Sequence, residues 1–223
     1  MLCLEEDSAR KLDSELTTSG EVVTWNLDRL GIPLIEIATA PDIKTPDHAK
    51  QTSIALGRTL RDTRRVRRGL GSIRQDLNVS IMCGDRVEIK GCQDLEWIPR
   101  IIRCEMARQL HFYRLANQLR EMHGLPSLPN DRREESESIE DQVNKILPLK
   151  LVDVTSRFTS CNSNRVKHGL SEKSVMLALP LPGFSGLIGT KKFDADGAQM
   201  PRLGRELAGA AKLAGVAGVY HSD

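Results

Sequence analysis

Aromatic residues and long hydrophobic runs are both scarce in this sequence. Phe, Trp and Tyr together make up 4% of the 223 residues. No uninterrupted apolar stretch approaches the roughly 18 residues that a membrane span needs. The opening residues MLCLEEDSARK are too acidic, and too short in their apolar part, for a signal peptide. We therefore expect a soluble protein. The length of 223 residues allows one large or two modest domains, and the 39% hydrophobic content is enough for their cores.

Paired cysteines and a large excess of one charge are also missing. The five cysteines, at positions 3, 83, 92, 104 and 161, are odd in number and show no metal-type spacing such as C-x-x-C. Neither a disulfide framework nor a zinc site is expected, which favours a reducing cytoplasm. The 32 basic and 30 acidic residues leave a net charge of +2, so any binding of nucleic acid must come from local clusters.

Hydrophobic periodicity predicts an α+β protein. Strands are expected at 20–28, 31–43, 73–81 and 86–90, with hardly any structure before the first of them, and helices at 46–63 and 98–122. The stretch 124–142 is rich in turn formers and charge and is interpreted as a linker or an exposed excursion, with a domain boundary near residues 124–148. Further strands are expected at 150–158, 174–184 and 215–221, with helices at 166–173 and 201–215.

Within the stretch GIPLIEIATAPDI at 31–43, one acid, Glu36, lies inside the apolar run that extends from Pro33 to Pro41. In an extended chain its side chain points away from Ile35 and Ile37. We expect this strand to be mostly buried, where a carboxylate is costly unless it is paired, hydrogen-bonded or bound to a cation. A structural ion pair and a cation site are both open for Glu36.

Three of the expected strands carry charge on the face opposite their aliphatic side. Glu36, Asp76, Glu88 and Lys90 are therefore able to meet on one sheet face. Carboxylates gathered in this way suit magnesium, which binds through one or two protein carboxylates together with substrate phosphates. A solvated antiparallel face is predicted equally well by the same alternation.

Arginines gather at two places in the chain. A basic turn contains Arg64, Arg65, Arg67 and Arg68, and the helix expected at 98–122 contains Arg100, Arg103, Arg108, Arg114 and Arg120. Both sets are able to contact RNA phosphates, although a solvated surface is the more common role of such charges. The glycine-rich stretch 182–192 matches neither a Walker loop nor a dinucleotide fingerprint.

Four stretches, taken in order, carry a family resemblance: LEEDSAR, NLDRLGIPLIEIATAPDI, RGLGSIRQDLNVSI and RVEIKGCQDLEWIPRIIRCEMARQ. They resemble the GatB/GatE family of tRNA-dependent amidotransferase subunits, in the forms of its archaeal branch, the glutamyl-tRNA(Gln) amidotransferase subunits called GatE. DVTSRF, LPLPGFSGLIG and RLGRELAGAAKLAGVAGVYHSD resemble the aspartyl-tRNA-synthetase-like domain inserted in GatE. The resemblance implies part of a mixed-sheet cradle domain over 1–123, a linker over 124–150 and a GAD-type inserted domain over 151–223.

The resemblance also implies a kinase-like activity. In the family, ATP phosphorylates the γ-carboxylate of glutamate misacylated on tRNA(Gln), and ammonia then displaces phosphate to give glutaminyl-tRNA. The implied partners are Glu-tRNA(Gln) and the asparaginase-like GatD protein, which supplies the ammonia, in a hetero-oligomer. Phosphorylation turns a poor leaving group into a good one, and a divalent metal offsets charge on the transferred group.

Carried over by position, the resemblance assigns Mg2+ and ATP to a small set of residues. Glu6 and Glu36 match magnesium ligands of the family's kinase site, and Asp76 matches a residue that helps to bind a second, transient metal. Arg74 and Lys90 are expected to be phosphate partners on geometry alone.

Parts of the family pattern have no counterpart in this sequence. The family begins with a segment that carries another acid and a histidine, and it continues into helical and tail domains. We therefore expect a fragment of a longer subunit, inactive by itself. A non-catalytic tRNA-binding or subunit-docking module, suggested by the basic turn, is the alternative, and a decayed reading frame without a stable product is the third possibility.

Overall fold

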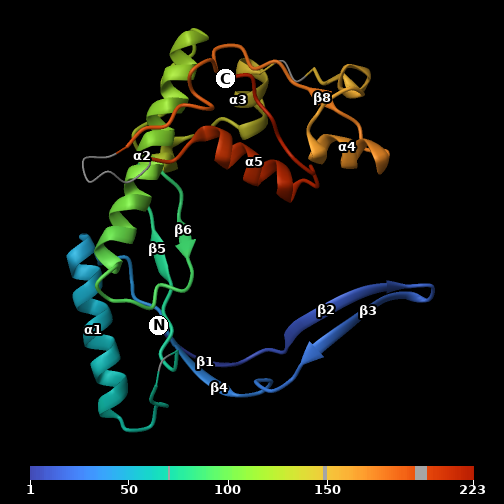
Figure 1. Cartoon of the computed structure of the whole chain (residues 1–223). Helices are drawn as coiled ribbons and strands as arrows, with labels where there is room; N and C mark the ends of the chain where they lie inside the picture. The colour runs from blue at the N-terminus through green and yellow to red at the C-terminus, as the bar shows by residue number, and fades with distance from the viewer. Residues whose placement is uncertain (70, 148–149, 194–199) are drawn as a thin grey trace. The chain divides into compact units, whose positions relative to one another are not determined.

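The computed structural model describes residues 1–69, 71–147, 150–193 and 200–223. The chain divides into two compact units, Met1–Asp62 and Thr63–Asp223, and both contain helices and strands (Figure 1). The expected α+β character is confirmed. Each of the four sheets formed by described residues has two antiparallel strands, so the mixed sheet implied by the resemblance is not found among them, because a mixed sheet needs at least three strands. The domain boundaries at 123 and 151 stay a prediction.

The first unit contains β1 (Leu2–Glu6), β2 (Arg10–Thr17), β3 (Gly20–Asn26), β4 (Pro33–Ile37) and α1 (Pro46–Asp62). The strands β3 and β4 and the helix α1 lie where the periodicity predicted them. Thr45 caps α1 as expected, because its Oγ1 accepts a hydrogen bond of 3.2 Å from the His48 N–H. The expectation of hardly any structure before residue 20 is wrong. The strands β1 and β2, of which β2 is mostly polar, form because each pairs with a later strand, β4 and β3 respectively.

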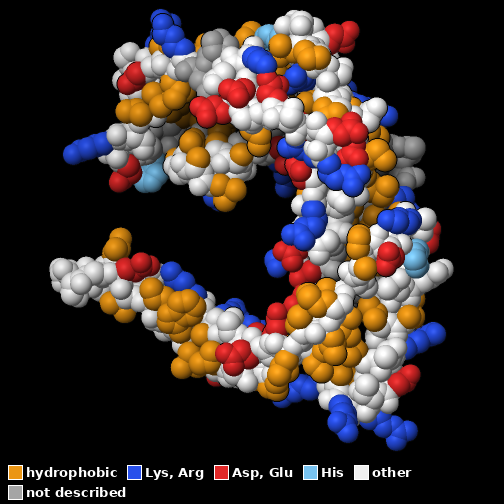
Figure 2. All heavy atoms as spheres, turned by 180° about the vertical axis from the view of Figure 1, so that it is seen from behind, with side chains coloured by type: hydrophobic (Ala, Val, Ile, Leu, Met, Phe, Trp, Pro, Cys, Tyr) orange, Lys and Arg blue, Asp and Glu red, His pale blue; other side chains and the backbone are white. Residues whose placement is uncertain are grey.

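The strands of the first unit are exposed. Along the β2–β3 ribbon, Leu16 is 90% exposed and Trp25 is 52% exposed, and Figure 2 shows hydrophobic side chains on the surface of this ribbon. The prediction of a mostly buried strand around Glu36 is wrong, because Ile35 is 60% exposed and Glu36 is exposed as well. Among the described residues β4 pairs only with β1, and a two-stranded sheet buries little of its surface.

The second unit is organised around its longest helix, α2 (Ile98–Met122), which matches the predicted range. The Ile98 side chain is fully buried, and Pro99 occupies the first turn, where its missing N–H costs no hydrogen bond. After the helix, Gly124 has a φ of +67°, which glycine adopts without steric cost. The strands β5 (Leu77–Val79) and β6 (Val87–Ile89) form a hairpin shorter than predicted, and β5 contacts α2.

Gln109 links α2 to the strand β5. It is 7% exposed; its side-chain NH2 donates to the Val79 carbonyl (3.1 Å) and to Glu105 (2.9 Å), and its Oε1 accepts from the Ile81 N–H (3.1 Å). Burial raises the pKa of Glu105, but the hydrogen bonds from Arg108 and Gln109 outweigh it, so the pKa of this carboxyl lies below its usual value. Because unpaired buried polar groups are costly, this network holds β5 in one position on α2.

Gly84→Ala is expected to destabilise the second unit by about 1 to 3 kcal/mol. A Cβ at this position would overlap Gln109 Oε1 and lie 3.1 Å from the Gln109 Cβ, so the Gln109 amide would lose its place between Val79 and Ile81. Gly209→Ala in α5 (Leu203–Leu213) is the matched control, because a Cβ there meets nothing within 4 Å and alanine favours a helix. Urea unfolding measures both variants, and equal midpoints would contradict the prediction.

Residues 125–147 fold back along α2 and contain η1 (Arg132–Glu134) and α3 (Ile139–Ile146) (Figure 1). The Tyr113 hydroxyl donates to the Leu128 carbonyl (3.0 Å), and the Leu128 N–H donates to Asn117 Oδ1 (2.7 Å). These contacts favour the second of the two interpretations of this stretch. Its described part is an excursion attached to α2 and not an open linker. We call residues 125–147 the excursion.

The remaining elements are short: β7 (Val152–Asp153), η2 (Thr155–Phe158), α4 (Asn164–Ser171), β8 (Leu177–Ala178) and α5. Of the strands expected at 150–158 and 174–184, only the short segments β7 and β8 are strands, and they pair with each other. The helices α4 and α5 match the expected helices. A small core joins Leu119 of α2 to Phe184 and Ile188.

The prediction of a strand at 215–221 is wrong, because these residues form no strand. The Asp223 carboxylate instead accepts hydrogen bonds from three backbone N–H groups, those of Gly186 (2.5 Å), Ile188 (2.9 Å) and Gly189 (3.1 Å). These hydrogen bonds lower the pKa of Asp223. The segment pairs with no described strand, and a strand without a partner gains nothing from its apolar alternation.

Candidate functional site

The β5–β6 hairpin presents one polar face. Its register pairs Asn78 with Glu88, and directly opposite residues share a face. By alternation Asp76 and Lys90 belong to this face too. The Lys90 Nζ lies 3.2 Å from Glu88 Oε2 and 3.8 Å from Asp76 Oδ2. The prediction that Asp76, Glu88 and Lys90 lie on one face is confirmed for this hairpin, and their chemical role stays a prediction.

This polar face is open to solvent. The side chains of Asp76, Glu88 and Lys90 are 41%, 48% and 73% exposed. The hydrogen bond and the charge of Glu88, with a smaller effect of Asp76, raise the pKa of Lys90 above its ordinary value. The Gly91 N–H donates to Asp76 Oδ1 (2.9 Å), which orients that carboxylate. A cation is able to bind the two carboxylates from the solvent side, and an anionic group is able to bind Lys90.

Glu6 and Glu36 come from the paired strands β1 and β4 of the first unit. The register places Cys3 opposite Glu36, and Glu6 opposite Pro33. Because side chains alternate along a strand, Glu5 lies on the same face as Glu36, while Glu6 lies on the other face at the last residue of β1. The two predicted ligands Glu6 and Glu36 therefore do not share a face of this sheet. Sequence reasoning did not single out Glu5, and only the register draws attention to it.

The five predicted site residues are divided between the two units. Glu6 and Glu36 belong to the first unit, and Arg74, Asp76 and Lys90 belong to the second. Arg74 is exposed and precedes β5. In the described ranges, no group of three or more His, Cys, Asp or Glu side chains is arranged to hold a metal ion. The metal role of Glu6, Glu36 and Asp76 thus stays a prediction.

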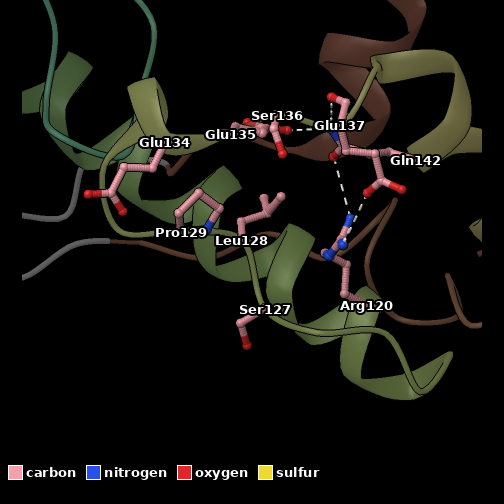
Figure 3. Close-up of a pocket in the computed structure, with 9 residues that line it drawn as sticks. All are labelled: Arg120, Ser127, Leu128, Pro129, Glu134, Glu135, Ser136, Glu137 and Gln142. Atoms are coloured by element: carbon pink, nitrogen blue, oxygen red, sulfur yellow. Dashed lines mark hydrogen bonds and ion pairs between the residues drawn. The ribbon is translucent and has the colours of Figure 1, made fainter.

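A pocket of about 280 Å³ lies between α2 and the excursion (Figure 3). It is lined by Arg120, Ser127, Leu128, Pro129, Glu134, Glu135, Ser136, Glu137 and Gln142. In Figure 3 the Arg120 side chain extends from α2 toward Glu137 and Gln142 of the excursion. The pocket combines acids with one buried arginine, so its charge pairing decides what it is able to bind.

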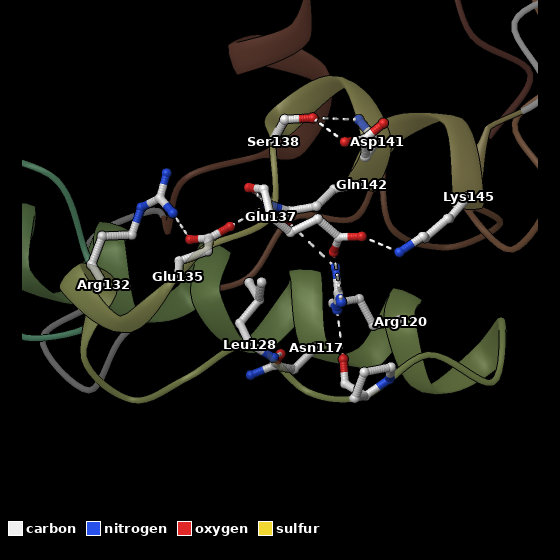
Figure 4. A network of polar contacts seen from close by, with 11 residues as sticks. Asn117, Arg120, Leu128, Arg132, Glu135, Glu137, Ser138, Asp141, Gln142 and Lys145 are labelled. Atoms are coloured by element: carbon white, nitrogen blue, oxygen red, sulfur yellow. Dashed lines mark hydrogen bonds and ion pairs between the residues drawn. The ribbon is translucent and has the colours of Figure 1, made fainter.

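Arg120 joins α2 to the excursion through a polar network (Figure 4). Its side chain is 6% exposed; Nε donates to the Pro126 carbonyl (2.6 Å), and the guanidinium lies 3.6 Å from Glu137. Glu137 also pairs with Lys145, and Glu135 pairs with Arg132. With Glu135 and Glu137 both neutralised, this network serves to hold the excursion rather than to bind a cation.

Two arginines of α2 have a different role from the one that their sequence pattern suggested. Arg120 is buried, and Arg108 pairs with Glu105 (2.8 Å) and Glu206 (3.3 Å). The interpretation of these two residues as solvated or RNA-facing is wrong, because each is neutralised by acids that lie on or near α2 in the folded chain. For Arg120, the acid-rich run that contains Glu135 and Glu137 was the available signal.

Comparison with known proteins decides the family. Residues 1–199, which include all five predicted site residues, match the GatB/GatE catalytic domain. The chain belongs to the GatB/GatE family. It is 43% identical to the GatE subunit of the glutamyl-tRNA(Gln) amidotransferase of Methanocaldococcus jannaschii and 44% identical to that of Aeropyrum pernix, in each case over 100% of the chain. The resemblance to archaeal GatE is thereby confirmed.

The chain spans about a third of its GatB/GatE relatives. It covers 31% of the length of the Methanocaldococcus jannaschii and Aeropyrum pernix proteins, and also of the Pyrococcus furiosus GatE, to which it is 42% identical. Across the described part of the chain, every helix is too short or too polar to pass through a bilayer.

Proposed function

We propose that the chain is part of a tRNA-dependent amidotransferase subunit. The subunit would use ATP to phosphorylate the γ-carboxylate of glutamate on tRNA(Gln) and would then join ammonia to form glutaminyl-tRNA(Gln). The match of residues 1–199 to the GatB/GatE catalytic domain carries this proposal. The names of the relatives, which are GatE subunits of glutamyl-tRNA(Gln) amidotransferases, support it.

Five residues would carry the chemistry of this reaction. We assign Glu6, Glu36 and Asp76 to magnesium, and Arg74 and Lys90 to phosphate oxygens. Bound magnesium would offset the negative charge of the transferring phosphoryl group. Lys90 lies 3.8 Å from Asp76, so its positive charge stands beside one of the assigned magnesium ligands. Its neighbour Asp76 has one carboxylate oxygen oriented by the Gly91 N–H.

Two of the three assigned magnesium ligands, Glu36 and Asp76, have positions that suit a magnesium ion, and the third, Glu6, does not share a face with Glu36. Glu36 and Asp76 both have exposed positions, which lets a hydrated ion approach, as magnesium requires. Glu6 is assigned from its place in the family motif, whereas the register of β1 and β4 favours Glu5 as the neighbour of Glu36. A comparison of substitutions at Glu5 and Glu6 separates the two assignments.

Partners and location follow from the same proposal. Ammonia would come from the asparaginase-like GatD protein in a hetero-oligomer that binds Glu-tRNA(Gln) in the cytoplasm. Residues 1–123 would form part of the cradle domain, and residues 151–223 the aspartyl-tRNA-synthetase-like insertion, after a connecting stretch at 124–150.

The test combines the complete subunit with its ammonia-supplying partner, misacylated Glu-tRNA(Gln), ATP and magnesium. ADP and glutaminyl-tRNA(Gln) are expected to form in equal amounts, and both products are expected to require Glu-tRNA(Gln). A rate of ADP formation that is the same with and without misacylated tRNA would contradict the proposal. Tight, salt-dependent tRNA binding without any ATP consumption would favour the second candidate, a non-catalytic tRNA-binding or docking module. The basic turn around Arg67 favours that candidate.

A further inference from the structure

We infer that the loop Arg64–Arg68 is an RNA-binding surface that holds the phosphodiester backbone. Four of its five residues are arginines, and none is acidic. The loop therefore carries +4 in a chain of net charge +2, so the rest of the chain sums to −2. This concentration of charge is the local cluster that RNA binding requires when the chain as a whole is nearly neutral.

The arginines of this loop lack partners within the described chain. Arg64, Arg65, Arg67 and Arg68 are all exposed, and none forms an ion pair with a described residue. Other arginines of the same chain do find acids, namely Arg29, Arg108, Arg120, Arg132 and Arg133. The loop thus keeps four guanidinium groups available for an external anion.

The backbone presents these side chains outward. The loop is irregular, with Arg64 at a φ of +58°, a left-handed conformation that costs a non-glycine residue about 1 kcal/mol or more. The Arg65 N–H donates to Thr63 Oγ1 (3.2 Å), which fixes the start of the loop.

A nucleic-acid strand matches this surface better than a small nucleotide does. Five residues extend over at most about 18 Å, and along such a length a nucleic-acid strand presents several phosphates. A nucleotide cofactor is normally held in a concave pocket, whereas these side chains project into solvent. The planar fork of arginine also suits paired phosphate oxygens.

The inference rests on the proposed function in one respect, because the RNA held here would be the substrate RNA. The binding itself is measured without ATP. A fluorescein-labelled tRNA(Gln) transcript is titrated with the full chain by fluorescence anisotropy, from about 50 to about 200 mM KCl. A chain that binds RNA through this loop but consumes no ATP would contradict the proposed reaction alone.

Arg67→Gln/Arg68→Gln is expected to weaken tRNA binding at least about tenfold at the lowest salt concentration. It is also expected to reduce the slope of log K against log salt by about 1.4 to 1.8, since each phosphate contact contributes about 0.7 to 0.9. Arg67→Lys/Arg68→Lys keeps the charge, so the slope is expected to stay and the affinity to fall only about two- to fivefold.

The matched control is Arg103→Gln/Arg114→Gln, which removes two exposed arginines from α2. Its affinity is expected to stay within about twofold of the parent chain. An equal loss in the loop and α2 variants would overturn the inference, and so would unchanged binding by the loop variant. Poly-L-glutamate is the competitor, and displacement of RNA by polyglutamate at equal charge would assign the loop to an acidic protein surface instead. Far-UV circular dichroism checks that each variant stays folded.

Discussion

Glu36→Gln is expected to weaken magnesium binding in the presence of ATP at least about tenfold, and to lower the amidation rate at least about a hundredfold. The substitution keeps the shape of the side chain and removes its charge, and a neutral amide is a poor ligand for a hard cation. Glu36 is exposed on β4, so a large effect on folding is not expected. Isothermal titration of magnesium chloride measures the affinity, and an unchanged affinity would remove Glu36 from the metal site.

Glu5 and Glu6 provide a matched pair of controls for this prediction. The two residues are neighbours in β1 and point to opposite faces of the β1–β4 sheet. Glu6→Gln is expected to reproduce the loss caused by Glu36→Gln, and Glu5→Gln is expected to stay within about twofold of the parent chain. The reverse result would mean that the sheet register, rather than the family motif, identifies the ligand.

Arg120→Ala is expected to lower the free energy of unfolding of the second unit by about 2 to 4 kcal/mol. Arg120 is 5% exposed, and its removal would leave the Pro126 carbonyl without its donor and the Glu137 carboxylate with Lys145 alone as its cationic partner. The excursion would then lose one of its polar attachments to α2 and keep those of Tyr113 and Asn117 to Leu128. Urea unfolding measures the free energy, and hydrogen exchange of residues 125–147 is expected to become faster at the same time.

Arg114→Ala is the control for the Arg120 prediction. Arg114 lies on the same helix but is exposed, so its replacement by alanine is expected to change the free energy of unfolding by less than about 0.5 kcal/mol. If Arg120→Ala were as mild as Arg114→Ala, the network in Figure 4 would contribute little to the fold.

Local patterns predicted the helices of this protein well. The cap at Thr45 and the periodicity of the following residues located α1, and Pro99 and Gly124 marked the two ends of α2. The alternation around Asp76 and Lys90 correctly placed both residues on one face of the β5–β6 hairpin. These signals depend on residues that are near one another in the sequence, so the sequence alone is enough to recognise them.

Prediction failed where a partner distant in the sequence decides the outcome. β1 and β2 were missed because only pairing with β4 and β3 makes them strands, and the residues of β2 are in addition mostly polar. The apolar segment 215–221 was expected to be a strand and is not, because no described strand pairs with it. Arg120 was expected on the solvated side of α2 and is buried by the excursion.

The sequence by itself determined the family, the main helices and the alternation that separates Glu36 and Asp76 from their aliphatic neighbours. Only the tertiary structure decided that Glu5 rather than Glu6 shares a face with Glu36, and that Arg120 is paired while Arg67 has no partner among the described residues. The physical reason is that alternation and helix capping are properties of neighbouring residues. Register and charge pairing, in contrast, depend on which distant segments the folded chain brings together.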